Sequence, residues 1–349
     1  MRLKWRFRSL RARLTAWRFR KINRAFNSAA EVVMLGNTDR ISGLGRSYRY
    51  ELERLARQGA PNRADAGDKT VIILGQPRGY PRLLSAAPAG FRDSYRIGLW
   101  VTEFETLPPD WRFAFEVVHE IWTPSTFCAA AIEAATDLPV KVMPHPVSIP
   151  DVDPLDRAQF GLGPDQFLGQ AIMDLRNCPD RKNPLAHIRA WKMAFGDDPA
   201  AHLLMKVRFS RRTQFMKDDL LREIGGAPNI SITELVLSDL ETTAFQRMAD
   251  VYISLHRSEG YGLNIKEMLE IGVPTLATGW SGNMDFMHSY PNATPIPFEL
   301  VPYEDRTWHY EGDTLRWAEA DVGYAADALV QIRQAWLDAR CQAPLRRAG

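Results

Sequence analysis

The sequence predicts an α/β protein with two Rossmann-like domains, each built on a parallel sheet. The chain has 349 residues, of which 45% are hydrophobic, and this is enough for two domains that each bury a core. Apolar, strand-like segments end in polar or glycine-containing loops, and helical patterns follow those loops, as in Rossmann-like units. The proline-rich segment 142–156 marks the connection between the domains. The expected parts are a basic amphipathic helix (1–28), a first domain (29–148), a second domain (149–325) and a C-terminal helix (326–349).

The N-terminal segment is predicted to be a cationic helix. Residues 1–24 are rich in Lys and Arg and contain no acidic residue. Apolar side chains recur at steps of four and three from Leu3 to Trp17, which places them on one helical face. Such a helix can lie on an anionic membrane surface through residues 1–26. The alternative is that it packs on the body of the protein.

Charge and cysteine usage narrow the class of protein. The net charge is +2, and the basic excess of the N-terminal segment leaves an acidic body, so nucleic acid is not an expected partner. Cys128, Cys178 and Cys341 have neither metal-binding nor redox spacing, which is typical of the reducing cytoplasm. No apolar run approaches the roughly 20 residues that span a bilayer. We expect a cytoplasmic protein that is peripheral at the inner face of the membrane.

The first domain is expected to open with a strand, a glycine-containing loop and a helix. Residues 31–37 form the apolar strand, Gly43 and Gly45 are assigned to the loop, and the helix ends near Gly59. Further strands are predicted at 70–75 and 96–101.

Residues 96–127 (RIGLWVTEFETLPPDWRFAFEVVHEIWTPSTF) contain a candidate binding carboxylate. Glu103 follows a predicted strand, and the carboxyl ends of parallel strands are where ligands bind. Glu103 is therefore a candidate contact for a ligand hydroxyl. The alternative is that it caps a helix or pairs with an arginine. His119 is placed on a helical face beside Trp122, where we expect a structural role.

The second domain is expected to begin with the strand 167–174, and a basic loop follows it. A helix is predicted to start at Pro184, directly after Arg181 and Lys182. A cation at a helix N-terminus is unfavourable unless an anion is bound there. Lys182 is therefore the first candidate for an anion contact.

The remaining elements alternate between strands and helices. Lys206, near the end of the predicted strand 203–207, is a candidate contact for a phosphate or a sugar. Asp151 and Asp153 form a D-x-D pattern, but they lie in the proline-rich connection, so no metal site is predicted. Further strands are expected at 229–234, 251–255 and 274–278, and a helical segment at 315–340.

The segment 254–287 (SLHRSEGYGLNIKEMLEIGVPTLATGWSGNMDFM) is the strongest functional signal. Glu259 follows an apolar strand, and the turn Gly260-Tyr261-Gly262-Leu263 leads into a helical pattern. Backbone N–H groups of such a turn can approach a phosphate, and the helix directs the positive end of its dipole to the same point. Glu267 lies about two turns into the helix. Two carboxylates beside an anion cradle suit a sugar nucleotide, because they accept hydrogen bonds from its hydroxyl groups.

These motifs carry a resemblance to a known family. The spacing of Glu259 and Glu267, followed by GVPTLATGWSGNMDFM, resembles the E-x7-E segment of family 4 retaining glycosyltransferases, which have the two-domain GT-B fold. Residues 96–127 resemble a subgroup of this family. The resemblance implies two domains that close over a nucleotide-diphospho-sugar. It also implies a metal-independent hexosyltransferase without a cofactor, whose donor is GDP-mannose as first choice or a UDP-hexose. The acceptor would be a glycan or a lipid-linked sugar in cell-surface polysaccharide assembly.

The resemblance also implies roles for individual residues. Glu259 would bind the transferred sugar and Glu267 the ribose, while Lys182 and one arginine, Arg181 or Arg176, would bind the donor diphosphate. Glu103 stands where many relatives have a histidine, and it would contact the acceptor. The final helix would cross back to the first domain. Backbone contacts to the donor are implied for Gly260, Tyr261, Gly262, Leu263, Gly43, Gly45, Ser281, Gly282 and Asn283.

Two alternative functions remain open at this point. One is a sugar-nucleotide epimerase or a phosphorylase of the same fold. The other is a membrane-associated GT-B scaffold without catalytic activity.

Overall fold

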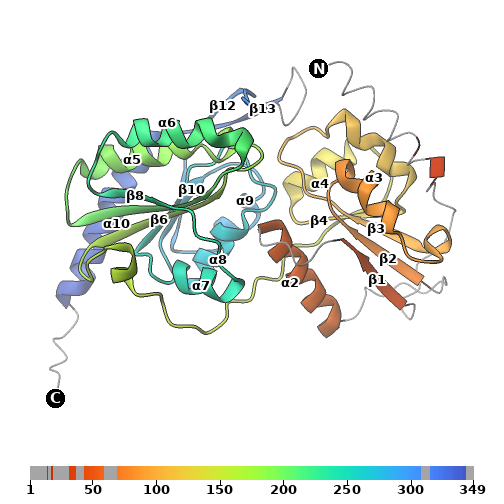
Figure 1. The fold of residues 1–349 in the computed structure, drawn as a ribbon, viewed down its shortest axis with the longest axis horizontal. Helices are drawn as coiled ribbons and strands as arrows, with labels where there is room; N and C mark the ends of the chain where they lie inside the picture. The colour runs from red at the N-terminus through yellow and green to blue at the C-terminus, as the bar shows by residue number, and fades with distance from the viewer. Residues whose placement is uncertain are drawn as a thin grey trace. The chain divides into compact units, whose positions relative to one another are not determined.

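The computed structural model describes residues 14, 17–18, 31–36, 43–58, 69–307 and 315–342. The predicted N-terminal helix, 1–28, therefore lies outside the described residues except at three positions. The described chain forms two compact units (Figure 1). The first contains the described residues up to Val147 together with Glu259–Tyr261, and the second contains most of the chain from Ser148 onward. Among the described residues, no helix combines the length and the apolar character that crossing a bilayer requires.

The first unit is built on a five-stranded parallel sheet in which the strands lie in chain order. Apolar residues pair in register across its centre, for example Val71 with Val33 and Ile72 with Ile97. Its strands are β1 (Glu31–Leu35), β2 (Lys69–Leu74), β3 (Tyr95–Leu99), β4 (Glu120–Thr123) and β5 (Val140–Val142). Its helices are α2 (Gly43–Gln58), α3 (Tyr80–Leu83) and α4 (Thr126–Glu133), with 3₁₀ turns η1 (Pro77–Gly79), η2 (Leu84–Ala86), η3 (Phe91–Asp93) and η4 (Pro109–Glu116).

The second unit contains a six-stranded parallel sheet in the order β11-β10-β9-β6-β7-β8. The chain runs outward from β6 to β8, then returns to place β9 on the other side of β6. The strands are β6 (Phe167–Asp174), β7 (Ala201–Arg208), β8 (Ile230–Thr233), β9 (Val251–Ser254), β10 (Thr275–Thr278) and β11 (Ala293–Ile296), and an antiparallel pair, β12 (Phe298–Pro302) and β13 (Arg316–Ala320), follows them. The helices are α5 (Pro184–Phe195), α6 (Gln214–Ile224), α7 (Asp239–Gln246), α8 (Leu263–Ile271), α9 (Met284–Met287) and α10 (Val322–Gln342), with 3₁₀ turns η5 (Arg157–Phe160), η6 (Asp180–Lys182) and η7 (Arg211–Thr213). The predicted fold class of two Rossmann-like units with parallel sheets is confirmed.

Alternation along β6 explains why helices cover both faces of this sheet. Phe167, Ala171 and Met173 pack with α5, α6 and α10 in one core. Leu168 packs with Phe245 of α7 in a second core on the opposite face. Side chains of successive strand residues point to opposite faces, so a strand that is apolar throughout can bury both. Figure 1 shows α5 and α6 on one side of the sheet and α7 and α8 on the other.

Three local expectations are wrong. Gly43 and Gly45 lie in the first turn of α2 instead of in a loop before it. Residues 316–320 form β13, not a helix, and pair with β12 across Ala318 and Leu300. His119 lies in a bend directly before β4, not on a helix, and accepts a hydrogen bond from the backbone N–H of Arg96 at 3.0 Å.

The C-terminal helix α10 packs in the core of the second unit. Along Val322–Gln342 it groups with the second unit, where it packs against α5. Ala325 and Leu329 are fully buried in the core that α5 shares. This burial accounts for its position in the second unit.

The close packing of β6 against α5 yields a testable prediction. A Cβ atom at Gly169 would lie 2.3 Å from Cζ3 of Trp191, a fully buried side chain. Gly169→Ala is therefore expected to lower the free energy of unfolding by about 1–3 kcal/mol, measured by urea denaturation. Gly163→Ala is the control, because its Cβ would meet Gln166 at an ordinary 3.7 Å. Equal stability of the two variants would show that Trp191 moves aside freely.

Candidate functional site

The strand order of the second unit indicates where a ligand would bind. The direction of the chain through the sheet reverses between β6 and β9, which are neighbours. Ligands of open parallel sheets bind beyond the carboxyl ends of the strands at such a reversal. The two loops at this point are residues 175–183 after β6 and residues 255–262 after β9. In the described part of the first unit the strands follow one another without a reversal.

The loop after β6 begins with an ion pair. Arg176 donates from Nε to Oδ1 of Asp174 at 2.8 Å and from Nη2 to Oδ2 at 2.5 Å. Burial alone would raise the pKa of Asp174, but hydrogen bonds and positive charge from Arg176, together with the charge of Lys182, hold that pKa below its ordinary value. Arg176 is therefore already engaged with a carboxylate in this structure.

Arg181 and Lys182 lie in η6, immediately before α5. Arg181 donates from Nη1 to the backbone oxygen of Ser258 at 2.6 Å, so the side chain reaches the loop after β9. Lys182 is half-buried. Asn183 has a left-handed conformation (φ 47°, ψ 50°), which turns the chain into the helix. The two cations thus stand beside the positive end of the α5 dipole, where an anion is favoured.

A buried histidine connects the same two loops. His187 accepts a hydrogen bond at Nε2 from the backbone N–H of Leu255 at 3.1 Å, so Nδ1 carries the proton and donates to the oxygen of Asn183 at 2.9 Å. Burial lowers the pKa of His187 to about 4. The neutral imidazole therefore holds the end of β9 against the start of α5.

The second helix N-terminus at this site is that of α8. Gly262 precedes the helix with φ 86°, and a Cβ there would lie 3.0 Å from Cβ of Asn283. This position therefore favours glycine for both conformation and space. Asn264, in the first turn, donates to the oxygen of Ile172 near the end of β6 at 3.3 Å. Leu263 is the first residue of the helix, and the N–H groups of a first helical turn point outward from the N-terminus.

The two predicted glutamates are placed differently. Glu259 is half-buried, and Gly260 and Tyr261 are buried; these three residues group with the first unit. Glu267 has a residue exposure of 1%, and Oε2 accepts a hydrogen bond from Nε2 of Gln246 at 2.7 Å. The carboxylate of Glu267 therefore also links α8 to α7 in the interior of the second unit.

The loop after β10 is joined to the loop after β9 by buried side chains. His256 lies 3.1 Å through Nε2 from Oδ1 of Asn283, and Nδ2 of Asn283 donates to the oxygen of Thr278 at 2.9 Å. Ser281 has a left-handed conformation with φ 74°. Asn283 is fully buried and Ser281 is 6% exposed, so the predicted backbone contacts of Ser281, Gly282 and Asn283 to a donor stay a prediction.

The other predicted residues are not part of these loops. Lys206 is 9% exposed and pairs in register with Ile172 of β6 and Thr233 of β8. Glu103 is half-buried and follows β3 in the first unit, at the carboxyl end of its strand. Gly43 and Gly45 belong to α2 in the same unit. The structure therefore gathers Arg181, Lys182, Gly262, Leu263 and the loop 281–283 in the second unit.

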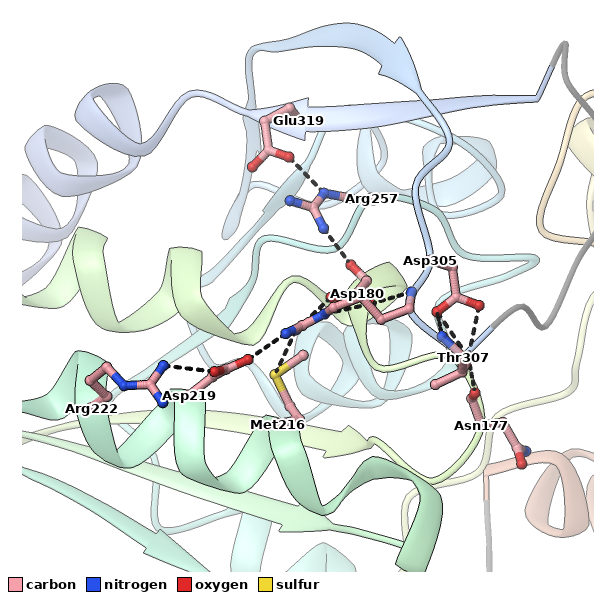
Figure 2. A network of polar contacts seen from close by, with 10 residues as sticks. Asn177, Asp180, Met216, Asp219, Arg222, Arg257, Asp305, Thr307 and Glu319 are labelled. Carbon is pink, nitrogen blue, oxygen red and sulfur yellow. Dashed lines mark hydrogen bonds and ion pairs between the residues drawn. The ribbon is translucent and has the colours of Figure 1, made fainter.

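A network of charged residues around the loop after β6 was missed by sequence reasoning. Figure 2 shows its members, among them Asp180, Arg257 and Glu319. Arg257 donates to Glu319 and to the backbone oxygen of Asp180, and Arg306 donates to the carboxylate of Asp180. These residues are far apart in the chain, and no spacing pattern in the sequence connects them.

Comparisons with known proteins identify similar solved structures but no matching family model. No protein-family model matches the chain, and neither does any curated protein. Among solved structures, WaaG, a glycosyltransferase involved in lipopolysaccharide biosynthesis, is similar with 13% identity and a TM-score of 0.55, over 90% of this chain and 95% of WaaG. The pneumococcal O-GlcNAc transferase GtfA, in complex with UDP and GlcNAc, is similar with 14% identity and a TM-score of 0.51, over 85% of this chain and 53% of GtfA.

A third similar structure is described as "Trehalose-6-phosphate from E. coli bound with UDP-2-fluoro glucose". Its protein is similar with 12% identity and a TM-score of 0.52, over 84% of this chain and 73% of that one. The chain spans about half the length of GtfA, at 53%, and of S. aureus TarM, at 48%. At these identities the comparisons confirm the GT-B fold, while membership of family 4 stays a prediction.

The neutral histidine yields a prediction about pH. The ordinary pKa of His187 is 6.5 and its folded pKa is about 4. Below pH 6.5 the unfolded chain binds a proton that the folded chain excludes, so this contribution to stability is lost as pH falls towards 4, by up to about 3 kcal/mol. His187→Gln is expected to be less stable than wild type at neutral pH, with a difference that shrinks on acidification in urea unfolding. A difference that is constant with pH would contradict the buried neutral imidazole.

Proposed function

We propose that this chain is a retaining, metal-independent glycosyltransferase that moves a hexose from a nucleotide-diphospho-sugar to a glycan or lipid-linked acceptor. One observation carries the proposal. Arg181 and Lys182 lie at the N-terminus of α5, in a loop bonded to the one before α8, where the sheet of the second unit reverses its strand order. Two cations and two helix N-termini at one sheet edge favour a diphosphate. The shared GT-B fold supports the same proposal.

The proposed chemistry needs stabilisation of the leaving diphosphate. Lys182 and Arg181 would supply positive charge, and the N–H groups at Gly262 and Leu263 would donate hydrogen bonds to its oxygens. These groups are in place before the reaction, so they stabilise charge as it develops. The departing phosphate would accept the proton of the acceptor hydroxyl on the same face of the sugar. No residue of the chain is then required to act as a nucleophile.

The remaining roles follow from the resemblance to family 4 glycosyltransferases. Glu259 would bind the transferred sugar, and Glu267, which stands on α8, would bind the ribose hydroxyls. Glu103, at the carboxyl end of β3, would contact the acceptor. Lys206 would contact a phosphate or the sugar. We also propose Ser281, Gly282 and Asn283 as backbone contacts to the donor.

The donor and location are the finer parts of the proposal. GDP-mannose is the first candidate donor and a UDP-hexose is the second. The second candidate is supported by the UDP bound in GtfA and by the UDP-sugar bound in the E. coli structure. The acceptor would belong to cell-surface polysaccharide assembly. Residues 1–26 would hold the enzyme at the inner face of the membrane, where a lipid-linked acceptor is found.

A ligand panel tests the proposed donor class. Purified protein is heated with GDP-, UDP-, dTDP- and ADP-sugars, with and without EDTA. One nucleotide family is expected to raise the melting temperature, because binding at 100 times the dissociation constant adds about 2.7 kcal/mol to the stability. The shift should be equal with and without EDTA, because no metal is needed for binding. A shift that EDTA abolishes would overturn the metal-independent proposal. No shift with any donor would favour the non-catalytic scaffold.

The proposed role of Lys182 predicts a loss in turnover. Lys182→Ala is expected to lower kcat for sugar transfer by roughly a hundredfold, because it removes charge at the leaving diphosphate. Lys192→Ala is the matched control: Lys192 lies on the same helix but donates to the backbone oxygen of Glu223 at 2.6 Å, outside the loop. An equal loss in both variants would point to damage to α5 in place of catalysis.

The proposed role of Glu267 predicts a loss in donor affinity. Glu267→Gln keeps an oxygen that can accept from Gln246, so its melting temperature is expected to stay near that of wild type. Its donor affinity is expected to fall about tenfold, because a neutral amide accepts less strongly from ribose hydroxyls. Calorimetric titration measures this. Unchanged affinity would restrict Glu267 to joining α8 and α7.

A further inference from the structure

We propose that Arg257 and Glu319 are positioning residues, which hold the loop after β6 in the conformation that binds the donor diphosphate. The inference rests on the proposed function, because it takes Lys182 and Arg181 as the diphosphate contacts. Neither Arg257 nor Glu319 is proposed to touch the donor. Their effect would be exerted through the backbone of residues 176–183.

The loop is held from outside along most of its length. The oxygen of Arg176 accepts from Oγ of Ser210 at 2.9 Å, and that of Asn177 accepts from Oγ1 of Thr307 at 2.7 Å. The next backbone oxygens that accept a hydrogen bond from outside the loop are those of Asp180 and Arg181, and both accept from Arg257. Arg257 therefore controls the part of the loop that carries the two cations.

Arg257 makes three directional contacts at once. Nη1 donates to the oxygen of Asp180 at 2.8 Å, Nε donates to Oε2 of Glu319 at 2.6 Å, and its backbone N–H donates to the oxygen of Arg181 at 2.8 Å. Its guanidinium also lies 5.0 Å from the ring centroid of Trp317. A planar guanidinium can satisfy two acceptors in fixed and different directions, whereas a lysine ammonium cannot reproduce this geometry. Arg257 lies in the loop after β9, so it sets the two loops of the site against each other.

Glu319 completes the arrangement from β13. One carboxylate oxygen accepts from Arg257, and the other accepts from Nδ2 of Asn183 at 2.9 Å. Asn183 has the left-handed conformation that turns the loop into α5. Glu319 therefore fixes the loop at its last residue, and Arg257 fixes it two and three residues earlier. Lys182 stands between these attachment points (Figure 2 shows Arg257 and Glu319).

A second ion pair supports the same loop. Arg306 donates from Nη2 to Oδ1 of Asp180 at 3.0 Å and from Nη1 to Oδ2 of Asp219 at 2.5 Å. It also lies over the ring of Phe215, 4.4 Å from its centroid. The side chain of Asp180 is thus held by Arg306 while its backbone is held by Arg257. This leaves η6 few ways to move without breaking charged hydrogen bonds.

The sign of a charge effect separates positioning from simple attraction. Glu319 is negative, so its charge near a bound diphosphate is unfavourable in Coulomb terms alone. Glu319→Gln removes this charge, and simple attraction predicts tighter binding. Positioning predicts weaker binding, because one amide cannot accept from both Arg257 and Asn183 with its two terminal atoms. The two explanations therefore predict opposite changes.

The test is calorimetric titration of the full chain with UDP and with GDP, using the nucleotide that wild type binds. Arg257→Lys, which keeps the charge, and Glu319→Gln are each expected to weaken binding about tenfold or more. Arg189→Gln is the matched control. It removes an ion pair of 2.8 Å between Arg189 on α5 and Glu223 on α6, outside the loop. The affinity of this variant should equal that of wild type. Melting temperatures of all variants are recorded beside the titrations.

A double-mutant cycle shows whether the effect passes through the loop. When Lys182→Ala is already present, Glu319→Gln is expected to weaken binding much less than it does alone, because the contact that it positions is absent. A merely structural role would give the same loss in both backgrounds. Independent effects, or tighter binding by Glu319→Gln, would overturn the inference.

The remaining outcomes separate this inference from the proposed function. If wild type and the Lys182→Ala variant bind as proposed but Arg257→Lys matches wild type, the positioning inference alone is overturned. If wild type binds neither UDP nor GDP, the proposed function is overturned and the inference falls with it. Glu319→Gln could also lower the melting temperature strongly. The inference is still supported if the loss of affinity caused by Glu319→Gln is smaller in the Lys182→Ala background, because both arms of the cycle contain the same destabilising substitution.

Discussion

Positive charge held at the N-terminus of a helix is the constraint around which the second unit is organised. Lys182 and Arg181 stand where the dipole of α5 is already positive, an arrangement that costs energy in the absence of an anion. Neighbouring carboxylates offset this cost: Asp174, Asp180 and Glu319 surround the loop. Each of these carboxylates is paired with an arginine: Asp174 with Arg176, Asp180 with Arg306 and Glu319 with Arg257.

Strand order explains why this charge lies beside a second helix N-terminus. The order of the strands along the sheet reverses between the parallel neighbours β6 and β9. The loops before α5 and α8 therefore lie next to each other. Two hydrogen bonds keep them together: a partly buried one from Arg181 to Ser258, and a buried one from Leu255 to His187. The described strands of the first unit have no such reversal. A diphosphate site in the second unit and an acceptor contact in the first are therefore consistent with the different topologies of the two sheets.

Buried polar groups give the site its rigidity. His187 is neutral because burial lowers its pKa, and a neutral imidazole can both donate and accept, so one side chain satisfies two backbone groups. Two other buried side chains join elements of this unit: Asn283 donates to the oxygen of Thr278 at the end of β10, and Glu267 on α8 accepts from Gln246 on α7. Satisfied buried networks of this kind allow few alternative arrangements. In the proposed enzyme such rigidity would keep the diphosphate contacts in place before the donor binds.

Local patterns in the sequence predicted the strands β6 to β10 and the turn before α8, but not β11 or β12. The segment 167–174 was predicted with the bounds it has as β6, because a continuous apolar run between polar loops is typical of a buried parallel strand. Short-range patterns were weaker at Gly43 and Gly45, since glycine is compatible with both a loop and the first turn of a helix. They were also weaker at 316–320, where a few apolar residues fit either period.

Only the tertiary structure decided how the basic loop is held. Arg257 and Glu319 are 62 residues apart, and Arg306 and Asp180 are 126 residues apart. Helix and strand periods relate residues within a few positions of each other, so no local pattern can join such pairs. The sequence by itself predicted which residues would bind a diphosphate. The return of the chain through β9 and β13 decided which side chains hold them, because sheet pairing brings these distant segments together.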